Sequence, residues 1–302
     1  MTIGDVGAAR IVVTGGAGLI GRATVALLRD RGAEVVSFDR VAAGIDGVED
    51  VVGDVRDASA VRSAVAGADA IVHLGGIPGP WLEDDVTTYA VNAVGTLAVF
   101  AAAAEAGIST VVYASSINAN GLPIGGRRPP SRLPYDEDEP VMIADTYSLS
   151  KEANERAAVM AHTLWGLDLT GLRFPLVRDI GADGGATFGA HIRAALRENP
   201  LRQAYEGWSY LDVVDAARAV EAALRHATPP APGILVAAPT TYLRVDTRDA
   251  AAAVIPGVPL GSIDGREVGL DLTRATELLD FRAERLLEHV SPELLAPIEG
   301  TP

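Results

Sequence analysis

The chain has 302 residues, no cysteine and a formal net charge of −15 at pH 7. This length is enough for one large or two small domains with a full core. The absence of cysteine excludes disulfides, thiolate metal ligands and cysteine nucleophiles, and we expect no metal site. An acidic surface repels phosphate backbones and anionic lipids, so neither nucleic-acid nor membrane partners are expected.

Targeting and membrane segments are not expected either. The first ten residues lack a charged stretch followed by an apolar one, which a signal peptide would carry. The longest apolar run, near residues 97–104, is far shorter than the roughly 20 residues that a membrane span needs. The sequence therefore favours a cytoplasmic protein.

Short runs rich in Val and Ile alternate with amphipathic or Ala-rich segments through the first two thirds of the chain. The runs predict strands at 10–14, 34–39, 51–54, 70–74, 110–115 and 167–173. The segments between them predict helices near 18–31, 58–66, 88–106 and 144–165. Because the strands are apolar on both faces, they fit a buried parallel sheet. The prediction is an α/β fold with a Rossmann-like, doubly wound sheet.

The alternation breaks at 121–140, where Gly and Pro precede an acidic run at 136–139. A long irregular segment is either a functional lid or a disordered insertion, and its place just before Tyr147 favours a lid. Further on, a helix is expected at 212–226 and a strand at 233–237. We therefore expect a dinucleotide-binding domain of residues 1–173 plus 208–238, and a smaller substrate lobe of residues 174–207 plus 239–302.

A glycine-rich loop follows the first strand and opens the first helix. Gly15, Gly18 and Gly21 give G-x-x-G-x-x-G, which permits a tight turn and brings backbone amides to a pyrophosphate at the helix N-terminus. Asp39 closes the second strand, where a carboxylate accepts hydrogen bonds from the adenosine ribose and repels a 2′-phosphate. NAD is therefore the expected cofactor. The alternative is NADP, because the neighbouring Arg40 could hold that phosphate.

Other residues at the same sheet edge are expected to contact the cofactor. Asp54 could bond the adenine amino group, with Val55 against the ring. Gly75 and Gly76 leave room after the fourth strand. The remaining expected cofactor contacts are Leu19, Ile20, Leu74, Asn92, Ser115, Phe174 and Pro175, together with Tyr147 and Lys151.

Tyr147 and Lys151 are four residues apart, which puts both on one face of the predicted helix. An ammonium near the phenol would lower the tyrosine pKa from its usual value of about 10, so that Tyr147 could act as acid or base. Lys151 is also the only lysine among the 25 basic residues. The guanidinium of Arg is a wide planar group, whereas the ammonium of Lys is a compact charge. A single lysine therefore indicates a position that Arg cannot fill. Ser115 and Ser116 end the fifth strand, where a hydroxyl could bond the reacting oxygen of a substrate.

The chain resembles the extended short-chain dehydrogenases, the NAD-dependent epimerase/dehydratase family, over about residues 10–240. The resemblance rests on residues 14–21, Asp39, Asp54, 73–76, Asn92, 113–116, 147–151, 172–175 and 210–215. It implies that Ser116 is the catalytic hydroxyl beside Tyr147 and Lys151, with Ser115 nearer the nicotinamide. It also implies a homodimer formed through the helices near 88–106 and 144–165.

Departures from the family pattern bear on the substrate. Ile117 and Asn118 stand where family dehydratases carry an acidic pair, so sugar dehydration is not expected. The stretch 174–178 differs from that of sugar-nucleotide epimerases. Residues 73–77 and 114–118 are similar to uronate dehydrogenases, which hold a sugar carboxylate with an arginine. Arg178 or Arg202 could do so here. The other residues expected at the substrate are Ile77, Ser116, Ile117 and Asn118.

The resemblance therefore implies hydride transfer between NAD and a hydroxyl-bearing carbon of a sugar or sugar nucleotide, as in an oxidoreductase or epimerase. The alternative is a dehydrogenase of a free sugar or sugar acid. Both share the first half-reaction, and the sequence does not separate them. A non-catalytic NAD sensor is a further alternative, but such proteins tend to lose the Ser, Tyr and Lys that this chain keeps.

Overall fold

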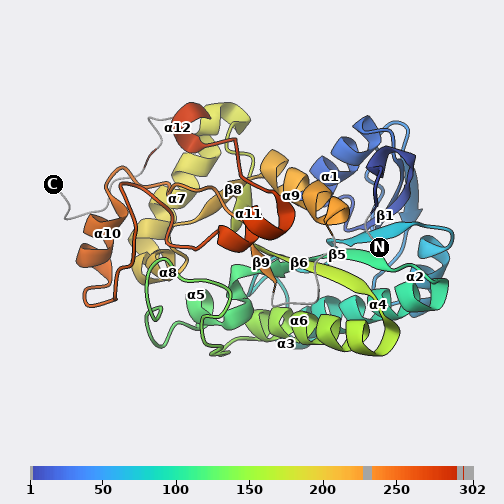
Figure 1. The fold of residues 1–302 in the computed structure, drawn as a ribbon, viewed down its shortest axis with the longest axis horizontal. Helices are drawn as coiled ribbons and strands as arrows, with labels where there is room; N and C mark the ends of the chain where they lie inside the picture. Colours follow the sequence, from blue (N-terminus) through green and yellow to red (C-terminus); the bar gives the residue numbers. More distant parts are fainter. Residues whose placement is uncertain (1–2, 227–232, 291–294, 296–302) are drawn as a thin grey trace.

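The computed structural model describes residues 3–226, 233–290 and 295. Its centre is a seven-stranded parallel sheet with the order β3-β2-β1-β4-β5-β6-β9 (Figure 1). The strands are β1 (Arg10–Thr14), β2 (Glu34–Asp39), β3 (Glu49–Val52), β4 (Ala70–His73), β5 (Thr110–Ser116), β6 (Asp168–Phe174) and β9 (Ile234–Leu235). From β1 the chain adds β2 and β3 on one side of the sheet, and it then adds β4, β5, β6 and β9 on the other side. This reversal of direction confirms the doubly wound fold.

Helices cover both faces of the sheet (Figure 1). On one face α1 (Leu19–Asp30) packs against α9 (Val213–Arg225). On the other face α2 (Ala58–Val65), α4 (Gly95–Ala106) and α6 (Thr146–Trp165) lie in a row. β3 differs from the prediction of a buried strand, because it is the edge strand and each of its residues is at least partly exposed. It also ends two residues earlier than predicted.

The helix before β5 is longer than the apolar run in the sequence indicates. It continues from α3 (Asp85–Tyr89) through a π-helical turn, η2 (Ala90–Val94), into α4. This stretch is the one described segment long and apolar enough to cross a membrane, with a mean hydropathy of 1.5. However, Asn92 and Thr96 on it make buried hydrogen bonds to Ser150 and His73. Together with its packing on α2 and α6, these bonds identify a core helix.

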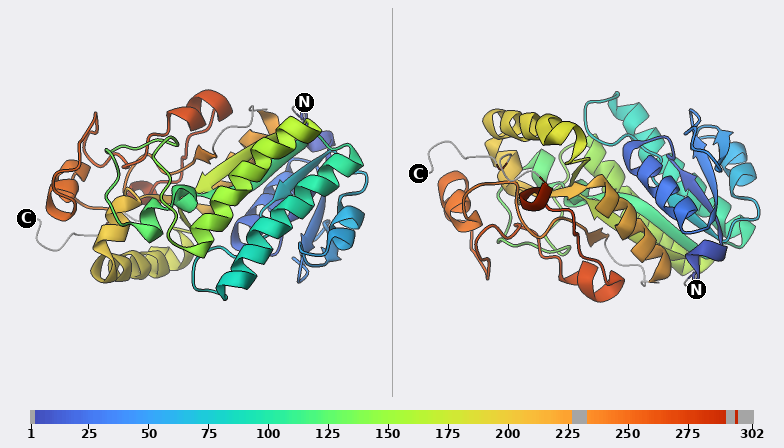
Figure 2. Two further views of the ribbon diagram at one scale, coloured as in Figure 1. Left: turned by 90° about the horizontal axis from the view of Figure 1, so that it is seen from below. Right: turned by 90° about the horizontal axis from the view of Figure 1, so that it is seen from above.

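The smaller lobe lies beyond the carboxyl ends of the strands (Figure 2). It holds a two-stranded parallel sheet of β7 (Leu176–Arg178) and β8 (Tyr210–Asp212), which the sequence did not predict. Its helices are α7 (Ala186–Glu198), α8 (Pro200–Tyr205), α10 (Thr247–Val254) and the short α12 (Leu287–Val290). Short helical turns lie at η1 (Val6–Ala8), η3 (Ile117–Asn120), α5 (Leu122–Gly125) and η4 (Ala182–Gly185).

Two of the three hydrophobic cores of the described residues cross the expected domain boundary. Although residues 239–302 were expected in the lobe, α11 (Thr273–Leu279) and Phe281 pack with α9 in the core of the sheet domain. Conversely, Leu133 and Tyr135 were expected in the sheet domain and lie in the core of the lobe. The boundary differs because apolar surface is shared between segments far apart in sequence. Residues 1–2, 227–232, 291–294 and 296–302 of the expected domains lie outside the described residues.

The segment 121–140 is bound to the lobe rather than lying free over it. Leu133 and Tyr135 are buried, and their amides donate to backbone carbonyls of the lobe at 2.9 and 3.1 Å. Within the acidic run, Glu137 and Glu139 are also buried and accept hydrogen bonds from their surroundings. This part of the expected lid, residues 133–139, is therefore anchored to the lobe, and we call it the strap.

Candidate active site

A cavity of about 630 Å³ opens above the carboxyl ends of β1, β4, β5 and β6, between the sheet and the lobe. A smaller hollow of about 160 Å³ continues from it towards β2 and β3. Most of the residues predicted from the sequence line one of the two. The larger cavity takes Gly15, Gly18, Leu19, Ile20, Gly21, Leu74, Gly76, Ile77, Ser115, Ser116, Ile117, Asn118, Tyr147, Lys151, Phe174, Pro175, Arg178 and Arg202. The smaller hollow adds Asp39, Arg40, Asp54, Val55 and Gly75.

The glycine loop has the geometry that a dinucleotide needs. Gly15 adopts a φ of +72°, and its amide donates to Phe38 at 2.8 Å, which fixes the turn to β2. A Cβ at Gly21 would lie 1.9 Å from the Gly15 carbonyl oxygen, so the helix packs closely only with glycine there. Gly18 caps α1 without a side-chain hydrogen bond, which leaves the first amides of the helix open to an anion in the cavity.

Asp39 is held in place at the smaller hollow. Its carboxylate accepts hydrogen bonds from the backbone amides of Ala17 at 3.0 Å and Arg40 at 2.6 Å. Asp54 faces the same hollow but is already paired with Arg56, whose Nη2 lies 2.6 Å away. That hydrogen-bonded guanidinium lowers the pKa of Asp54 to about 2. Asp39 therefore presents a fixed carboxylate, whereas the expected adenine contact at Asp54 competes with Arg56.

Asn92 does not line either hollow, contrary to the expectation of a cofactor contact. Its Oδ1 accepts a hydrogen bond from the Ile77 amide at 2.7 Å, and its Nδ2 donates to Ile77 O and Ser150 Oγ, both at 3.1 Å. The side chain is 1% exposed. The side-chain oxygen and nitrogen of Asn92 thus bind protein groups, and these bonds fix the loop after β4 against α6.

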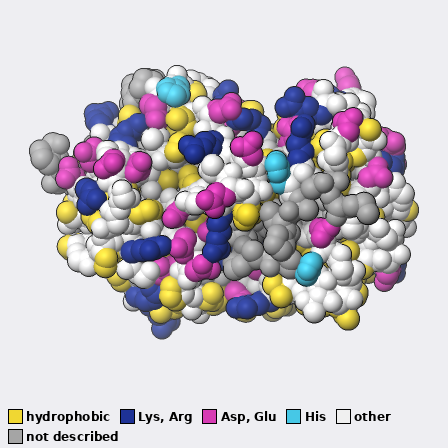
Figure 3. All heavy atoms as spheres, in the orientation of Figure 1, with side chains coloured by type: hydrophobic (Ala, Val, Ile, Leu, Met, Phe, Trp, Pro, Cys, Tyr) yellow, Lys and Arg dark blue, Asp and Glu magenta, His cyan; other side chains and the backbone are white. Residues whose placement is uncertain are grey.

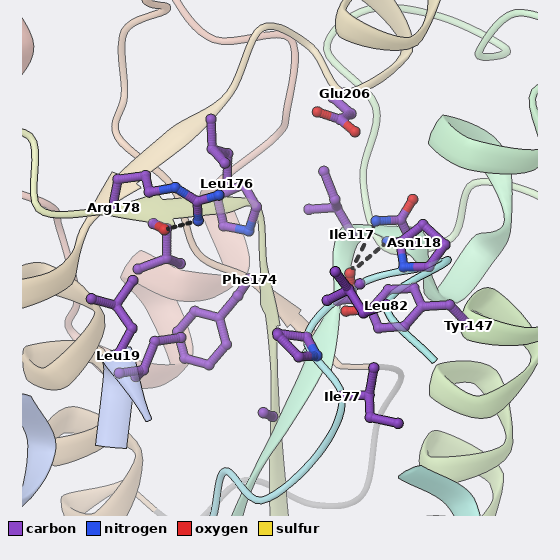
Figure 4. A pocket seen from close by; sticks show the side chains of 18 of the residues that line it. Leu19, Ile77, Leu82, Ile117, Asn118, Tyr147, Phe174, Leu176, Arg178 and Glu206 are labelled. Carbon is purple, nitrogen blue, oxygen red and sulfur yellow. Dashed lines mark hydrogen bonds between the residues drawn. The ribbon is translucent and has the colours of Figure 1, made fainter. Parts of the chain in front are cut away.

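Tyr147 and Ser116 meet at the floor of the cavity. Tyr147 is buried, and burial raises its pKa to about 12, while a hydrogen bond with Ser116 opposes the rise. The lowered pKa expected from the neighbouring lysine is therefore not found in the protein alone. Ser116 also accepts hydrogen bonds from the amide and side chain of Asn118 at 3.1 and 3.2 Å (Figure 4). The phenol is therefore protonated at neutral pH, and it lines the cavity together with Ser116.

Lys151 lies over the ring of Tyr147. Its Nζ is 5.7 Å from the ring centroid and donates to the Ala114 carbonyl at 3.1 Å. Burial lowers the pKa of Lys151 to about 8, and the charge of Glu155 opposes that shift. The ammonium therefore lies beside the phenol ring and keeps donors available to a ligand.

A buried ion pair behind these residues was not predicted. Glu155, four residues after Lys151, accepts hydrogen bonds from Arg173 Nε and Nη2 at 2.8 and 2.7 Å. The same carboxylate accepts a bond from Ser115 Oγ at 2.6 Å. Ser115, which is expected nearer the nicotinamide, lines the cavity and donates its hydroxyl to Glu155. The network fixes α6 against the ends of β5 and β6.

The lobe contributes a group of basic side chains to the far wall of the cavity. Arg178, His191 and Arg202 all line it, and the charges of both arginines lower the pKa of His191 in addition to burial. Arg202 is paired with the buried Glu206, its Nε 2.8 Å from Oε1. Arg178 makes no ion pair with any described residue, and its Nη1 donates only to the neighbouring Val177 carbonyl. His191 and Glu206 carry no sequence motif and were not predicted.

A comparison with protein families decides the affiliation. The model of the NAD dependent epimerase/dehydratase family matches residues 11–238. The chain belongs to this family. The resemblance drawn from the sequence is confirmed.

Individual relatives are similar in part of their length. The 2-alkyl-3-oxoalkanoate reductase of Stenotrophomonas maltophilia is 33% identical over 171 residues, which cover 52% of this chain and 51% of that protein. The L-arabinose 1-dehydrogenase (NAD(P)+) of Haloferax volcanii is 34% identical over 173 residues, 55% and 66% of the two chains. The chain spans about half the length of the first of these curated relatives.

A solved structure with bound NAD is similar over almost the whole chain. It is a short-chain dehydrogenase/reductase superfamily protein from Agrobacterium tumefaciens, 25% identical, with a TM-score of 0.72 and a match of 95% of this chain and 96% of that one. NAD is the cofactor of the family, and the residues here fit it. The open amides of α1 suit the pyrophosphate, and the fixed carboxylate of Asp39 suits the ribose hydroxyls.

Proposed function

We propose that the chain is a dehydrogenase that oxidises a free sugar acid with NAD. The observation that carries the proposal is Arg178, an arginine with no ion-pair partner among the described residues, in the same cavity as Tyr147. In Figure 4 the two side chains reach the cavity from opposite sides, Arg178 from β7 and Tyr147 from α6. A guanidinium binds a carboxylate through two parallel hydrogen bonds, so Arg178 suits the acid group of a substrate whose hydroxyl lies at Tyr147.

The electrostatics of the far wall support an anionic substrate. Three basic side chains gather there in a protein whose net charge is −15. Arg202 is neutralised by Glu206, and the lowered pKa of His191 leaves its imidazole uncharged at neutral pH, so Arg178 is the group of the three that meets a negative charge. A local positive region in an acidic protein concentrates small anions at the site.

The size of the cavity favours a free sugar over a sugar nucleotide, the other reading of the sequence. The volume of about 630 Å³ reaches from the glycine loop to α8, so it has to hold the nicotinamide half of NAD as well as the substrate. One sugar ring fits that remainder better than a sugar joined to a nucleoside diphosphate. The Haloferax volcanii relative, 34% identical, is by its name a dehydrogenase of a free sugar.

The roles of the residues follow from their positions. Bound NAD supplies the acceptor for the hydride that leaves the substrate carbon. Tyr147 takes up the proton of the same hydroxyl in its phenolate form, after its own proton has passed to solvent, and Ser116 holds the substrate oxygen by a hydrogen bond. Lys151 stabilises the phenolate through space and, as the family resemblance implies, holds the nicotinamide ribose. One hydride and one proton leave the substrate, and a carbonyl remains.

The test compares an acidic with a neutral sugar. Arg178→Met should raise the KM for a hexuronic acid about 30-fold, the worth of a charge-assisted hydrogen bond pair, and leave kinetics with the neutral hexose within threefold. The matched control is Arg193→Met, also on the lobe but outside the cavity, which should change neither. An equal loss on acid and neutral sugar would show that Arg178 does not bind a carboxylate.

A further inference from the structure

Glu206 is a buried carboxyl group in the wall of the substrate cavity. It follows α8 directly and is 6% exposed, yet it lines the cavity that contains Tyr147 and Ser116. Figure 4 shows its carboxylate turned into the cavity, on the side of Ile117 and Asn118. None of the roles described above uses this group.

Only one of the two carboxylate oxygens of Glu206 accepts a hydrogen bond from a described residue. Oε1 accepts the hydrogen bond from Arg202 Nε at 2.8 Å, whereas no described residue donates to Oε2. Burial raises the pKa of Glu206, and the charge of Arg202 opposes the rise. Because Glu206 lines the cavity and its Oε2 is not one of the buried unpaired atoms, this oxygen is open to the cavity. Water or a ligand there can supply the donor that the protein does not.

The backbone holds Glu206 in one place. The next residues turn through two positive φ angles, +65° at Gly207 and +50° at Trp208, and Trp208 is fully buried. Ser209 Oγ donates to the Glu206 carbonyl at 2.6 Å. A Cβ at Gly207 would lie 2.9 Å from the Cα of Gly269, so the turn is packed without spare room. Such a rigid support is what a recognition group needs.

We propose that Glu206 is a specificity-determining residue, whose Oε2 accepts a hydrogen bond from a substrate hydroxyl other than the one that is oxidised. This inference rests on the proposed function and deepens it. The substrate class is then a polyhydroxylated acid, bound by its carboxylate at Arg178, by the reacting hydroxyl at Tyr147 and by a third group at Glu206. A carboxylate acceptor rejects an analogue that lacks the hydroxyl, because the analogue leaves the acceptor unpaired.

The experiment measures kcat/KM for hexuronic acids, the corresponding neutral hexoses and their monodeoxy analogues. The wild type should prefer the full sugar to one of its deoxy analogues by about 10- to 100-fold, which is the worth of a hydrogen bond to a charged group. Glu206→Gln should lose about that factor on the full sugar and less than threefold on that deoxy analogue. The preference should therefore disappear in the variant.

A purely structural role gives a different result. If Glu206 serves only to pair with Arg202, Glu206→Gln lowers kcat/KM equally for the full and the deoxy sugar, and the proposal is overturned. NAD binding and the melting temperature report whether the variant is folded, and Glu206→Asp, which keeps the charge, replaces it if it is not. The control is Glu221→Gln, a buried glutamate paired with Arg31 far from the cavity, which should keep both the rate and the preference.

The same data separate this inference from the proposed function. Equal turnover of a hexuronic acid and its neutral hexose contradicts the sugar-acid proposal, but the deoxy comparison can then be made on the hexose and still decides the role of Glu206. A preference for acids combined with indifference to every deoxy position keeps the proposed function and overturns the role of Glu206. No turnover of any sugar overturns both.

Discussion

Lys151 combines a requirement for function with a cost in stability. It is 7% exposed, and its ammonium has one protein acceptor, the Ala114 carbonyl at 3.1 Å. Burial lowers its pKa from 10.5 to about 8, so the folded protein binds this proton less tightly than the unfolded chain does. Below pH 8 the charged group therefore disfavours the folded state.

Lys151→Met should stabilise the protein without cofactor while abolishing turnover. The free energy of unfolding at pH 7 should rise by about 1–3 kcal/mol, because the variant buries no charge. Both states of the wild type lose the proton as the pH passes from about 8 to 10.5, so the gain should shrink across that window. Urea unfolding at pH 7 and above pH 10.5 measures it. A less stable variant at pH 7 would show that Glu155 compensates the buried charge.

Lys151→Arg should keep the fold and lose activity by about 10²-fold or more, the scale of one acid–base component. The charge is preserved, but a guanidinium is bulkier and holds its donors in a plane, so it does not fit between Tyr147 and the cofactor ribose. Steady-state kinetics with normal NAD binding is the measurement. Near-normal turnover would mean that the single lysine is an accident of composition.

At the residue scale, motifs with fixed spacing were predictable and isolated side chains were not. The glycine loop, Tyr147 and Lys151 were found because the spacing itself carries the chemistry. Glu206 and His191 have no spacing signal, since only the folding of the lobe brings them to the cavity. The tyrosine pKa was predicted in the wrong direction because the sequence does not show how deeply the phenol is buried.

At the scale of elements, long buried strands were predicted best. β1 and β2 begin and end where predicted, because Gly15 follows the first apolar run and Asp39 ends the second. β7 and β8 were missed, since they are three residues each and pair across a long stretch of chain. The acidic run at 136–139 resembles a solvated loop in sequence, yet every second residue of it is buried in the strap.

The strap depends on Glu139 for its shape. This buried carboxylate accepts hydrogen bonds from Arg128 Nη1 at 2.8 Å and from the amide and hydroxyl of Ser131. Glu139→Ala should therefore lower the free energy of unfolding by about 2–3 kcal/mol and speed hydrogen exchange in the strap. Asp138→Ala, which removes an exposed pair with Arg274, should cost less than about 1 kcal/mol. Equal costs for the two variants would contradict the anchoring role.

At the scale of the whole molecule, charge and apolar surface are distributed differently. On the face shown in Figure 3, acidic and basic side chains are interspersed, in line with the many arginine–carboxylate pairs. By contrast, α4 and α6 run side by side along one face in Figure 2, and exposed apolar side chains follow these helices and α3. They are Val86, Val94, Leu97, Leu149, Val159, Met160 and Leu164. A helix face of this kind marks an interaction surface.

We propose that this face forms the homodimer that the family resemblance implies. The double variant Leu97→Glu, Leu164→Glu places charges in the apolar face and should shift the protein to a monomer, because the interface would bury unpaired carboxylates. Sedimentation velocity measures the shift. Leu278→Glu, an exposed leucine on α11, is the control and should leave the mass unchanged. A wild type that sediments as a monomer would contradict the proposal.

The central claim, NAD-dependent oxidation of a free sugar acid, is tested most directly by NADH formation during turnover. Absorbance of free NADH should rise in proportion to the hexuronic acid consumed, because a dehydrogenase releases the reduced cofactor in every cycle. Tyr147→Phe should abolish the rise, since it removes the group that takes up the proton. Conversion of a sugar nucleotide to its epimer with no net NADH, and no NADH from any sugar acid, would contradict the account.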